Sequence, residues 1–205
     1  MIRKTYLCIS LALLSLALAG CNMGPSHDKV FGSAEVATGS SVSEVSTVNG
    51  DVHVAANARA GDASTVNGSV SIGAGAHVAD ASAVNGDIEL GQHASASEAS
   101  TVNGSISLAS GAHVVGDTTS VNGDITLAVA AVVGGELSNV NGDISLAGAQ
   151  VGKGISTVNG DIHISGNSVV NGGITVHKAH GGLGDFFHWD SDDVPTITIG
   201  PGASV

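Results

Sequence analysis

The chain has 205 residues, with 6 basic against 18 acidic side chains and a formal net charge of −12 when histidine is neutral. This balance argues against nucleic-acid binding, which needs clustered lysine and arginine to contact phosphates. Aromatic residues make up only 2% of the chain, so the core must be built from aliphatic and small side chains.

Residues 1–20 have the features of a cleaved secretory signal peptide. Two basic residues, Arg3 and Lys4, precede an apolar run over residues 7–18, which is short for a membrane span and typical of a signal h-region. The Leu-Ala-Gly-Cys motif that ends at Cys21 resembles the lipobox of bacterial lipoproteins. That resemblance implies that Cys21 is lipidated and becomes the new N-terminus.

A lipid anchor also agrees with the cysteine content. The only other cysteine, Cys8, would leave with the signal, so the mature chain cannot form an internal disulfide. Two or more acyl chains on Cys21, as the family implies, would attach the protein stably to a membrane. Asn22 follows the cysteine, and by resemblance to the sorting rule of diderm lipoproteins this implies the outer membrane.

Residues 21–43 are rich in Gly, Ser and Ala and show no clear period. They predict a lipidated, flexible tether.

From residue 44 to residue 176 the chain repeats one short motif. The Asn-Gly pair recurs after 18, 18, 18, 19, 19, 18 and 12 residues, at asparagines Asn49, Asn67, Asn85, Asn103, Asn122, Asn141, Asn159 and Asn171. A fixed short period is the signature of a solenoid. After each pair, aliphatic residues alternate with polar ones, as in Val52-His53-Val54, which indicates half-buried strands.

Three inward pairs per repeat predict a triangular coil. In the first repeat these pairs are Ser46/Val48, Val52/Val54 and Ala58/Ala60. The fold class is therefore all-β, a single-stranded triangular parallel β-helix with about 18 residues per coil, and we expect it to be right-handed. The alternative is a meander in which each Asn-Gly pair makes a hairpin turn, but it does not explain the equal repeat lengths.

Polar columns are expected to form ladders between coils. The serines that begin with Ser46 should bond to one another or to the backbone, and the asparagines that begin with Asn49 should form a second ladder of amide or backbone contacts. In the column after Asn-Gly, Asp124, Asp143 and Asp161 follow one another directly. They form either a solvated acidic edge or a site where a divalent cation is shared between carboxylates.

Residues 177–193 interrupt the repeats, and residues 194–205 return to the repeat pattern as a final partial coil. The interruption contains three aromatic residues, Phe186, Phe187 and Trp189, which would cap the last coils or contact a protein or glycan partner. Its other candidate ligands, His177, His180, His188 and Asp190, could bind zinc, copper or nickel. These histidine and aspartate residues do not have the spacing of a defined metal motif.

No catalytic motif supports an enzyme, because the chain has no nucleophile elbow, P-loop or dinucleotide fingerprint. The six-residue recurrence is similar to that of hexapeptide-repeat acyltransferases, but their catalytic loop is not identifiable here. We therefore expect a protein without catalytic activity and without a cofactor other than the lipid.

The Val-Asn-Gly-Asp-Ile-x-Leu repeats and the closing Pro-Thr-Ile-Thr-Ile-Gly-Pro-Gly-Ala-Ser-Val segment resemble bactofilin-type polymer-forming proteins and adhesin-like surface repeats. The resemblance covers residues 44–205 and implies a β-helix that assembles end to end. The export signal departs from the cytosolic bactofilins. We expect a lipid-anchored envelope scaffold or adhesin-like protein. Its partner would be a second copy of itself, or an envelope protein or glycan. The alternative is a ligand- or metal-binding module that uses residues 177–193.

Overall fold

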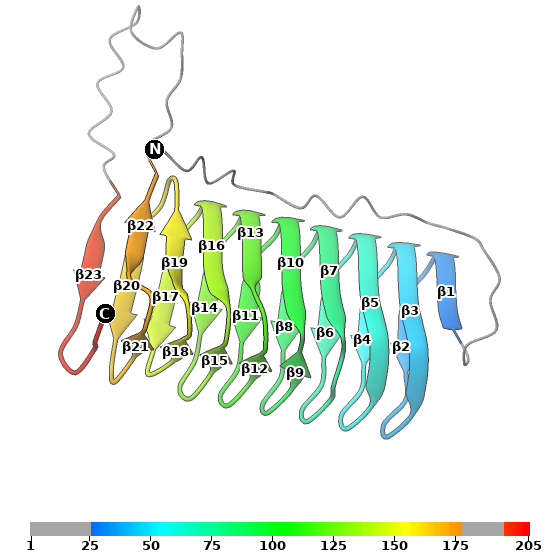
Figure 1. The fold of residues 1–205 in the computed structure, drawn as a ribbon. Coiled ribbons are helices and arrows are strands. Elements are labelled where there is room, and N and C mark those ends of the chain that lie inside the picture. The colour runs from blue at the N-terminus through cyan, green and yellow to red at the C-terminus, as the bar shows by residue number, and fades with distance from the viewer. Residues whose placement is uncertain (1–25, 178–194) are drawn as a thin grey trace, which may run out of the picture.

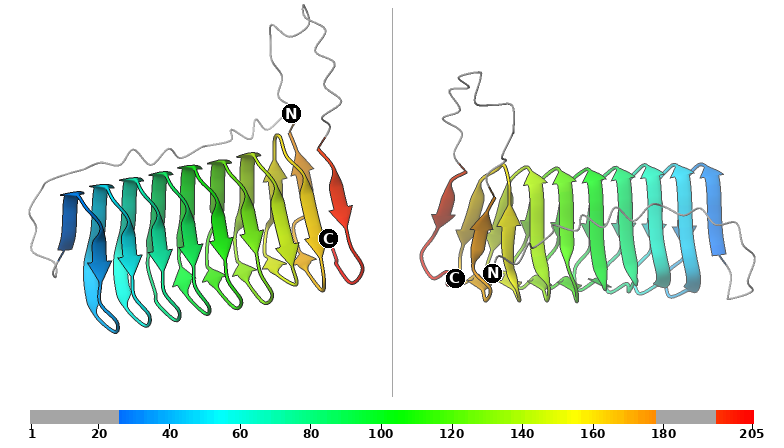
Figure 2. Two further views of the ribbon diagram at one scale, coloured as in Figure 1. Left: turned by 180° about the vertical axis from the view of Figure 1, so that it is seen from behind. Right: turned by 45° about the horizontal axis from the view of Figure 1, so that its top comes forward.

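The structure is a computed structural model that describes residues 26–177 and 195–205. Within these ranges all the regular structure is β-strand, and neighbouring strands run parallel. Successive coils stack along one axis, with β1 at one end and β23 at the other (Figure 1). The same row of coils is visible from behind and from above (Figure 2).

Three parallel sheets form the sides of the solenoid. The first sheet contains β1 (Ser26–Phe31), β3 (Ser41–Asn49), β5 (Arg59–Asn67), β7 (Asp80–Asn85), β10 (Glu98–Asn103), β13 (Thr118–Asn122), β16 (Glu136–Asn141), β19 (Gly154–Thr157) and β22 (Ile174–Val176). The second sheet contains β2 (Ala34–Val36), β4 (Val52–Val54), β6 (Val70–Ile72), β8 (Ile88–Leu90), β11 (Ile106–Leu108), β14 (Ile125–Leu127), β17 (Ile144–Ala147), β20 (Ile162–Ser165) and β23 (Ile197–Ile199). The third sheet contains β9 (Ser95–Ala96), β12 (His113–Val114), β15 (Val132–Val133), β18 (Gln150–Val151) and β21 (Val169–Val170).

The strand register follows the sequence repeat. Asn49 lies opposite Asn67, and Val52 lies opposite Val70, in parallel pairs 18 residues apart. Hairpin turns at the Asn-Gly pairs would make neighbouring strands antiparallel, so the meander alternative is wrong and the parallel β-solenoid is confirmed. Nine strands stacked at about 4.8 Å give a rod roughly 38 Å long. The right-handed winding stays a prediction.

The core is a narrow aliphatic column. In the second sheet Val52 and Val54 are buried on either side of the exposed His53, and this alternation recurs along the rod. The inward pair of the third side, Ala58 and Ala60, is also buried. These two inward pairs agree with the prediction from the sequence.

The first sheet departs from the prediction by one residue. Its inward side chains are Val45 and Thr47, while Val48 is only half buried on the outer face. The cause is that strands such as β5 continue without a break around the corner between the third side and the first sheet. In β5 only Gly61 and Asp62 separate the inward residues of the two sides, Ala60 and Ala63, so the alternation shifts and the predicted inward pair Ser46/Val48 is wrong.

The solenoid also begins earlier than expected. Residues 26–43, which we assigned to the tether, contain β1 and β2, and these pair in parallel with β3 and β4. The segment Gly32-Ser33-Ala34-Glu35-Val36 aligns with Gly50-Asp51-Val52-His53-Val54, but Phe31 stands where the repeat has asparagine. The repeat was therefore missed because its Asn-Gly marker is absent.

The glycine of each Asn-Gly pair permits close stacking of the coils. A Cβ added to Gly104 would lie 2.1 Å from the carbonyl oxygen of Gly86 in the preceding coil, and one added to Gly86 would lie 1.8 Å from that of Gly68. No side chain fits at such distances. The repeat thus keeps glycine because backbone meets backbone there.

Candidate functional site: the two ends and the polar ladders

The first coil is closed by two polar side chains. His27 and Lys29 of β1 lie opposite the inward residues Val45 and Thr47 of the next coil. The Lys29 ammonium donates a hydrogen bond to the carbonyl oxygen of Ser33 at 2.6 Å, and Nδ1 of His27 bonds to the carbonyl oxygen of Glu35 at 3.2 Å. Both side chains therefore reach from β1 to the backbone of the β2 edge.

These carbonyls belong to the free edge of the second sheet. The N–H of Ala34 donates to Asp51, and the carbonyl of Val36 accepts from Ala55, so Ala34 and Val36 direct their backbone groups toward β4. In a parallel ladder the backbone groups of successive residues face opposite edges of the strand, so those of Ser33 and Glu35 point to the open side. His27 and Lys29 thus bond to edge acceptors, and Ala34 and Val36 behind them are fully buried.

Among the residues that the structure describes, no strand pairs with the outer edge of β23 in the last coil. The N–H of Ile162 donates to Thr196 at 2.9 Å, and the N–H of Gly200 donates to Ile164 at 2.7 Å. By the same alternation, the N–H and C=O groups of Ile197 and Ile199 point away from β20. Their side chains follow the buried column of Ile162 and Ile164, yet they are 42% and 51% exposed.

Other apolar side chains are exposed in the last coil as well. Val176 of β22 is 38% exposed and Val205 is 51% exposed. A row of exposed aliphatic residues with unpaired backbone groups is the usual template for adding another strand. The two ends of the rod therefore differ at the edge of the second sheet: His27 and Lys29 cap the carbonyls beside β2, whereas β23 presents an apolar edge. The first coil also exposes apolar side chains, Val30 at 58% and Phe31 at 79%.

A ladder of side-chain acceptors joins the coils at the position after Asn-Gly. Each side-chain oxygen in this column accepts a hydrogen bond from the backbone N–H of the same position in the next coil. The column consists of Ser33, Asp51, Ser69, Asp87, Ser105, Asp124, Asp143, Asp161 and the final N–H donor Thr196, with distances from 2.7 to 3.3 Å. This shared role explains why only Asp and Ser occur there before Thr196.

The asparagine column forms the second ladder, as predicted. Each Nδ2 donates to the Oδ1 of the asparagine in the preceding coil, from Asn67 bonded to Asn49 at 3.0 Å to Asn159 bonded to Asn141 at 2.9 Å. The serine column does not form such a chain of bonds among the described residues. Ser46 donates to Asp28 at 2.8 Å, whereas Ser168 bonds to the backbone, donating to the carbonyl of Ser165 at 2.7 Å.

The candidate cation residues Asp124, Asp143 and Asp161 lie in consecutive coils of the acceptor ladder. One oxygen of each carboxylate, Oδ1, accepts a backbone hydrogen bond. Across residues 26–177 and 195–205 no group of three or more potential ligands has the geometry of a metal site. Cation binding by these three residues stays a prediction.

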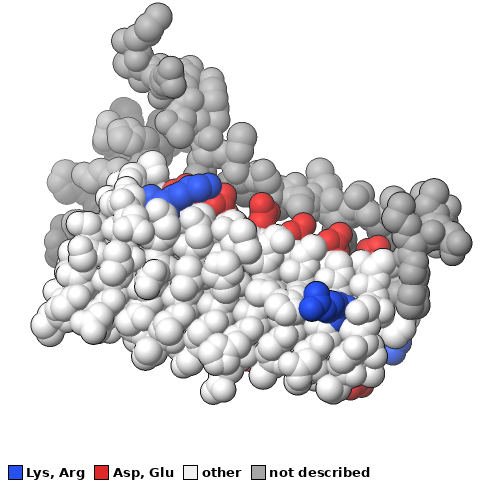
Figure 3. Space-filling view, turned by 60° about the horizontal axis from the view of Figure 1, so that its bottom comes forward, with Lys and Arg blue, Asp and Glu red and all other residues white. Residues whose placement is uncertain are grey.

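A second acidic row was not recognised in the sequence. It runs along the outer side of the first sheet, with one carboxylate in each of six consecutive coils: Glu44, Asp62, Asp80, Glu98, Asp117 and Glu136. Figure 3 shows acidic side chains following one another along the rod, with a basic group at one end of the row. Lys153 pairs with Asp117 at 3.6 Å. The 18- and 19-residue spacing could have revealed this row.

Repulsion within this row and burial change its acid–base properties. The pKa of Glu44 is raised by partial burial and by the nearby charges of Asp28 and Asp62. The pKa of Asp62 is raised by partial burial and by Asp80. The first coils of the row therefore hold carboxylates that resist ionisation.

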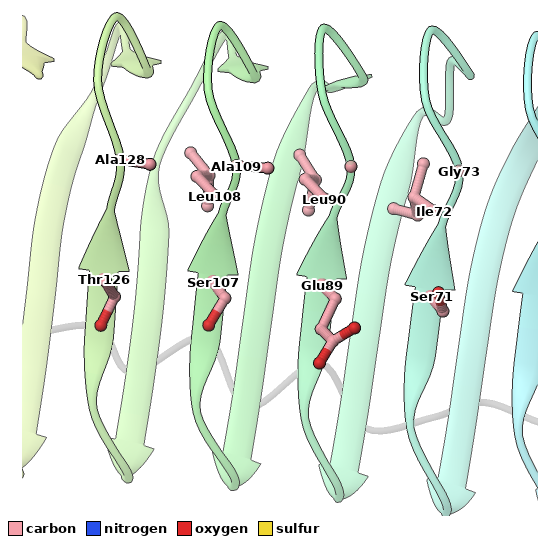
Figure 4. A pocket seen from close by; sticks show the side chains of 11 residues that line it. Ser71, Ile72, Gly73, Glu89, Leu90, Ser107, Leu108, Ala109, Thr126 and Ala128 are labelled. Carbon is pink, nitrogen blue, oxygen red and sulfur yellow. The ribbon is translucent and has the colours of Figure 1, made fainter.

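A shallow groove lies on the outer side of the second sheet (Figure 4). Its volume is about 430 Å³, and its polar side chains are Ser71, Glu89, Ser107 and Thr126 from four successive coils. No recorded hydrogen bond joins the Glu89 carboxylate to one of the three hydroxyls, so these four side chains do not form a nucleophile–base pair.

The remaining candidate residues fall largely outside the described part of the chain. Of the set after the repeats, only His177 is described; it is exposed, and its N–H donates to the carbonyl of Thr157 at 2.8 Å. The candidates outside are Cys21, His180, Phe186, Phe187, His188, Trp189 and Asp190.

In the described ranges no helix is long and apolar enough to span a membrane. The chain matches no protein-family model, and no curated protein or solved structure is significantly similar to it. Function therefore has to be inferred from the parallel β-solenoid and its unlike ends.

Proposed function

We propose that this protein is a non-catalytic, lipid-anchored rod of the bacterial cell envelope that acts as a scaffold or adhesin-like element. The observation that carries the proposal is the difference between the ends, because a capped first coil and an open last coil suit a rod that is attached at its start and makes contacts at its tip. The resemblance of the repeats to bactofilin-type and adhesin-like proteins supports the same class of function.

The position of the first coil gives the proposal a definite geometry. Only four residues lie between Cys21 and Ser26, where β1 begins, and the five Cα–Cα steps from Cys21 to Ser26 span at most about 18 Å. A lipid on Cys21 would therefore hold the capped end close to the bilayer. The rod would then place its last coil up to roughly 38 Å further away.

Metabolic labelling with an acyl-chain probe, followed by fractionation of a diderm host, tests this proposal. The full-length chain should incorporate the probe and partition with outer membranes. Cys21→Ser should lose both properties, whereas Cys8→Ser, which changes a cysteine inside the expected signal, should retain them. Unlabelled protein, or membrane partitioning that Cys21→Ser does not alter, would contradict a lipid anchor.

A further inference from the structure

We propose that the open last coil binds the same coil of a second copy, so that two rods join tail to tail in a closed, two-fold dimer. This inference deepens the proposed function by naming the partner of the tip. The dimer can be disproved without disproving the proposed function, because a rod can be lipid-anchored and still be monomeric.

The capped end disfavours a head-to-tail joint. Continuing the ladder from β23 into β2 of another copy would require Ile197 and Ile199 to donate to the carbonyls of Ser33 and Glu35. Lys29 and His27 already bond to those carbonyls. Inward-pointing polar side chains at an edge strand are a known means of preventing further strand addition, so an open-ended filament is not expected.

Strand β23 is complementary to itself when two copies are antiparallel. With Thr198 on the two-fold axis, Ile197 of one copy lies opposite Ile199 of the second copy, and each pair exchanges both N–H···O=C bonds. These are the backbone groups that β20 leaves free. The same arrangement turns the exposed Ile197 and Ile199 side chains of both copies toward a joined interior.

Charge also favours contact at this end. Residues 195–205 contain no charged side chain, whereas the flank of the first sheet carries a carboxylate in each of six consecutive coils. Two such rods repel one another when they lie side by side, and the repulsion is weaker where β23, which carries no charged side chain, meets β23 of the second copy. A closed two-fold contact uses one patch on both copies and ends the assembly at two.

Cysteine cross-linking of the full-length chain, carrying Cys8→Ser and Cys21→Ser, tests the joint. Two Thr198→Cys copies should form a disulfide with each other, because residues at this non-hydrogen-bonded antiparallel position lie within disulfide reach. The matched control is Thr126→Cys, which occupies the same outward column in mid-rod. We expect Thr198→Cys to cross-link at least about tenfold faster than this control.

Each other outcome contradicts the proposal in a different way. A disulfide between Thr198→Cys and Glu35→Cys in a mixture would show head-to-tail joining. Cross-linking of Thr198→Cys no faster than Thr126→Cys, with monomers at all concentrations in sedimentation, would show that the tip does not bind a second copy. Either result leaves the acyl-labelling test of the anchor unaffected.

Discussion

The carboxylate of Asp143 accepts a hydrogen bond at 2.8 Å from the backbone N–H of Asp161 in the next coil. The contact gives this column a structural role that needs an acceptor rather than a charge. Asp143→Ala should lower the free energy of unfolding by about 1 kcal/mol, whereas Asp143→Ser should retain most of it, since Ser69 and Ser105 act as acceptors in the same column. Urea unfolding monitored by circular dichroism measures both. Equal losses in the two variants would show that the carboxylate acts through its charge.

Two buried threonines of the first sheet provide a matched pair. The Thr101 hydroxyl donates to the carbonyl of Gly86 at 2.9 Å, while the buried Thr118 hydroxyl has no hydrogen-bond partner among the described residues. Thr101→Val should destabilise the protein by about 1 kcal/mol, because the half-buried carbonyl of Gly86 loses its donor, and Thr118→Val should be neutral or stabilising. Thermal unfolding of both variants checks the difference, and destabilisation by Thr118→Val equal to that by Thr101→Val would refute it.

Close stacking predicts which glycines tolerate a methyl group. Gly104→Ala would bring its Cβ within 2.1 Å of the Gly86 carbonyl oxygen, whereas a Cβ on Gly39 meets nothing within 4 Å. We expect Gly104→Ala to cost more than about 3 kcal/mol, a value seen for severe steric changes. Gly39→Ala, limited to the strain of its φ of +69°, should cost about 1 kcal/mol. Soluble Gly104→Ala protein with unchanged melting would contradict the observed stacking.

We expect mild acidification to raise the free energy of unfolding, because of the carboxylates in the acidic row. The pKa values of Glu44 and Asp62 are raised by partial burial first and by neighbouring carboxylates second. A carboxyl group whose pKa is higher in the folded state binds protons more tightly there, so its stabilising contribution is present at low pH and is lost as pH rises through the folded pKa.

Melting temperatures measured between about pH 4 and pH 7 test the direction of this pH dependence. The double variant Glu44→Gln, Asp62→Asn should show a smaller loss of stability on going to neutral pH than the unmodified chain. Glu89→Gln, which removes a carboxylate outside the row, is the control and should leave more of the pH dependence in place. An unchanged pH profile in the double variant would exclude the row as its cause.

Removing the cap should convert a closed assembly into an open one. The double variant His27→Ala, Lys29→Ala frees the carbonyls of Ser33 and Glu35 at the first coil, so strand addition becomes possible at both ends. Sedimentation should then reveal species larger than two copies that grow with concentration. Lys153→Ala removes a lysine ammonium elsewhere on the rod, and it should not produce them.

The sequence predicted the coil because its period is enforced by contacts between identical residues. Asn67 must meet Asn49, and Val70 must meet Val52, so the repeat is visible without coordinates. The inward side of the first sheet was misassigned because a bend inside a continuous strand changes the alternation by one residue, and a six-residue recurrence does not reveal that bend.

The ends were hardest to predict, since a terminal coil has a partner on one side only and its residues escape the repeat. Lys29 occupies a column that otherwise holds uncharged residues such as Thr47, Ala83 and Asn139, and without the alignment of the first coil it looks like part of a tether. The exposure of Ile197 and Ile199 depends on whether another coil stacks on them, which the pattern Ile-Thr-Ile cannot show.

Hydrogen exchange of the full-length protein at several concentrations tests the unlike ends most directly, because it reports on backbone groups at both ends in one experiment. We predict that the amides of Ile197 and Ile199 become more protected as concentration rises, while those of residues 33–36 do not change. Protection that rises with concentration at residues 33–36, or at neither end, would contradict the difference between a capped and an open end.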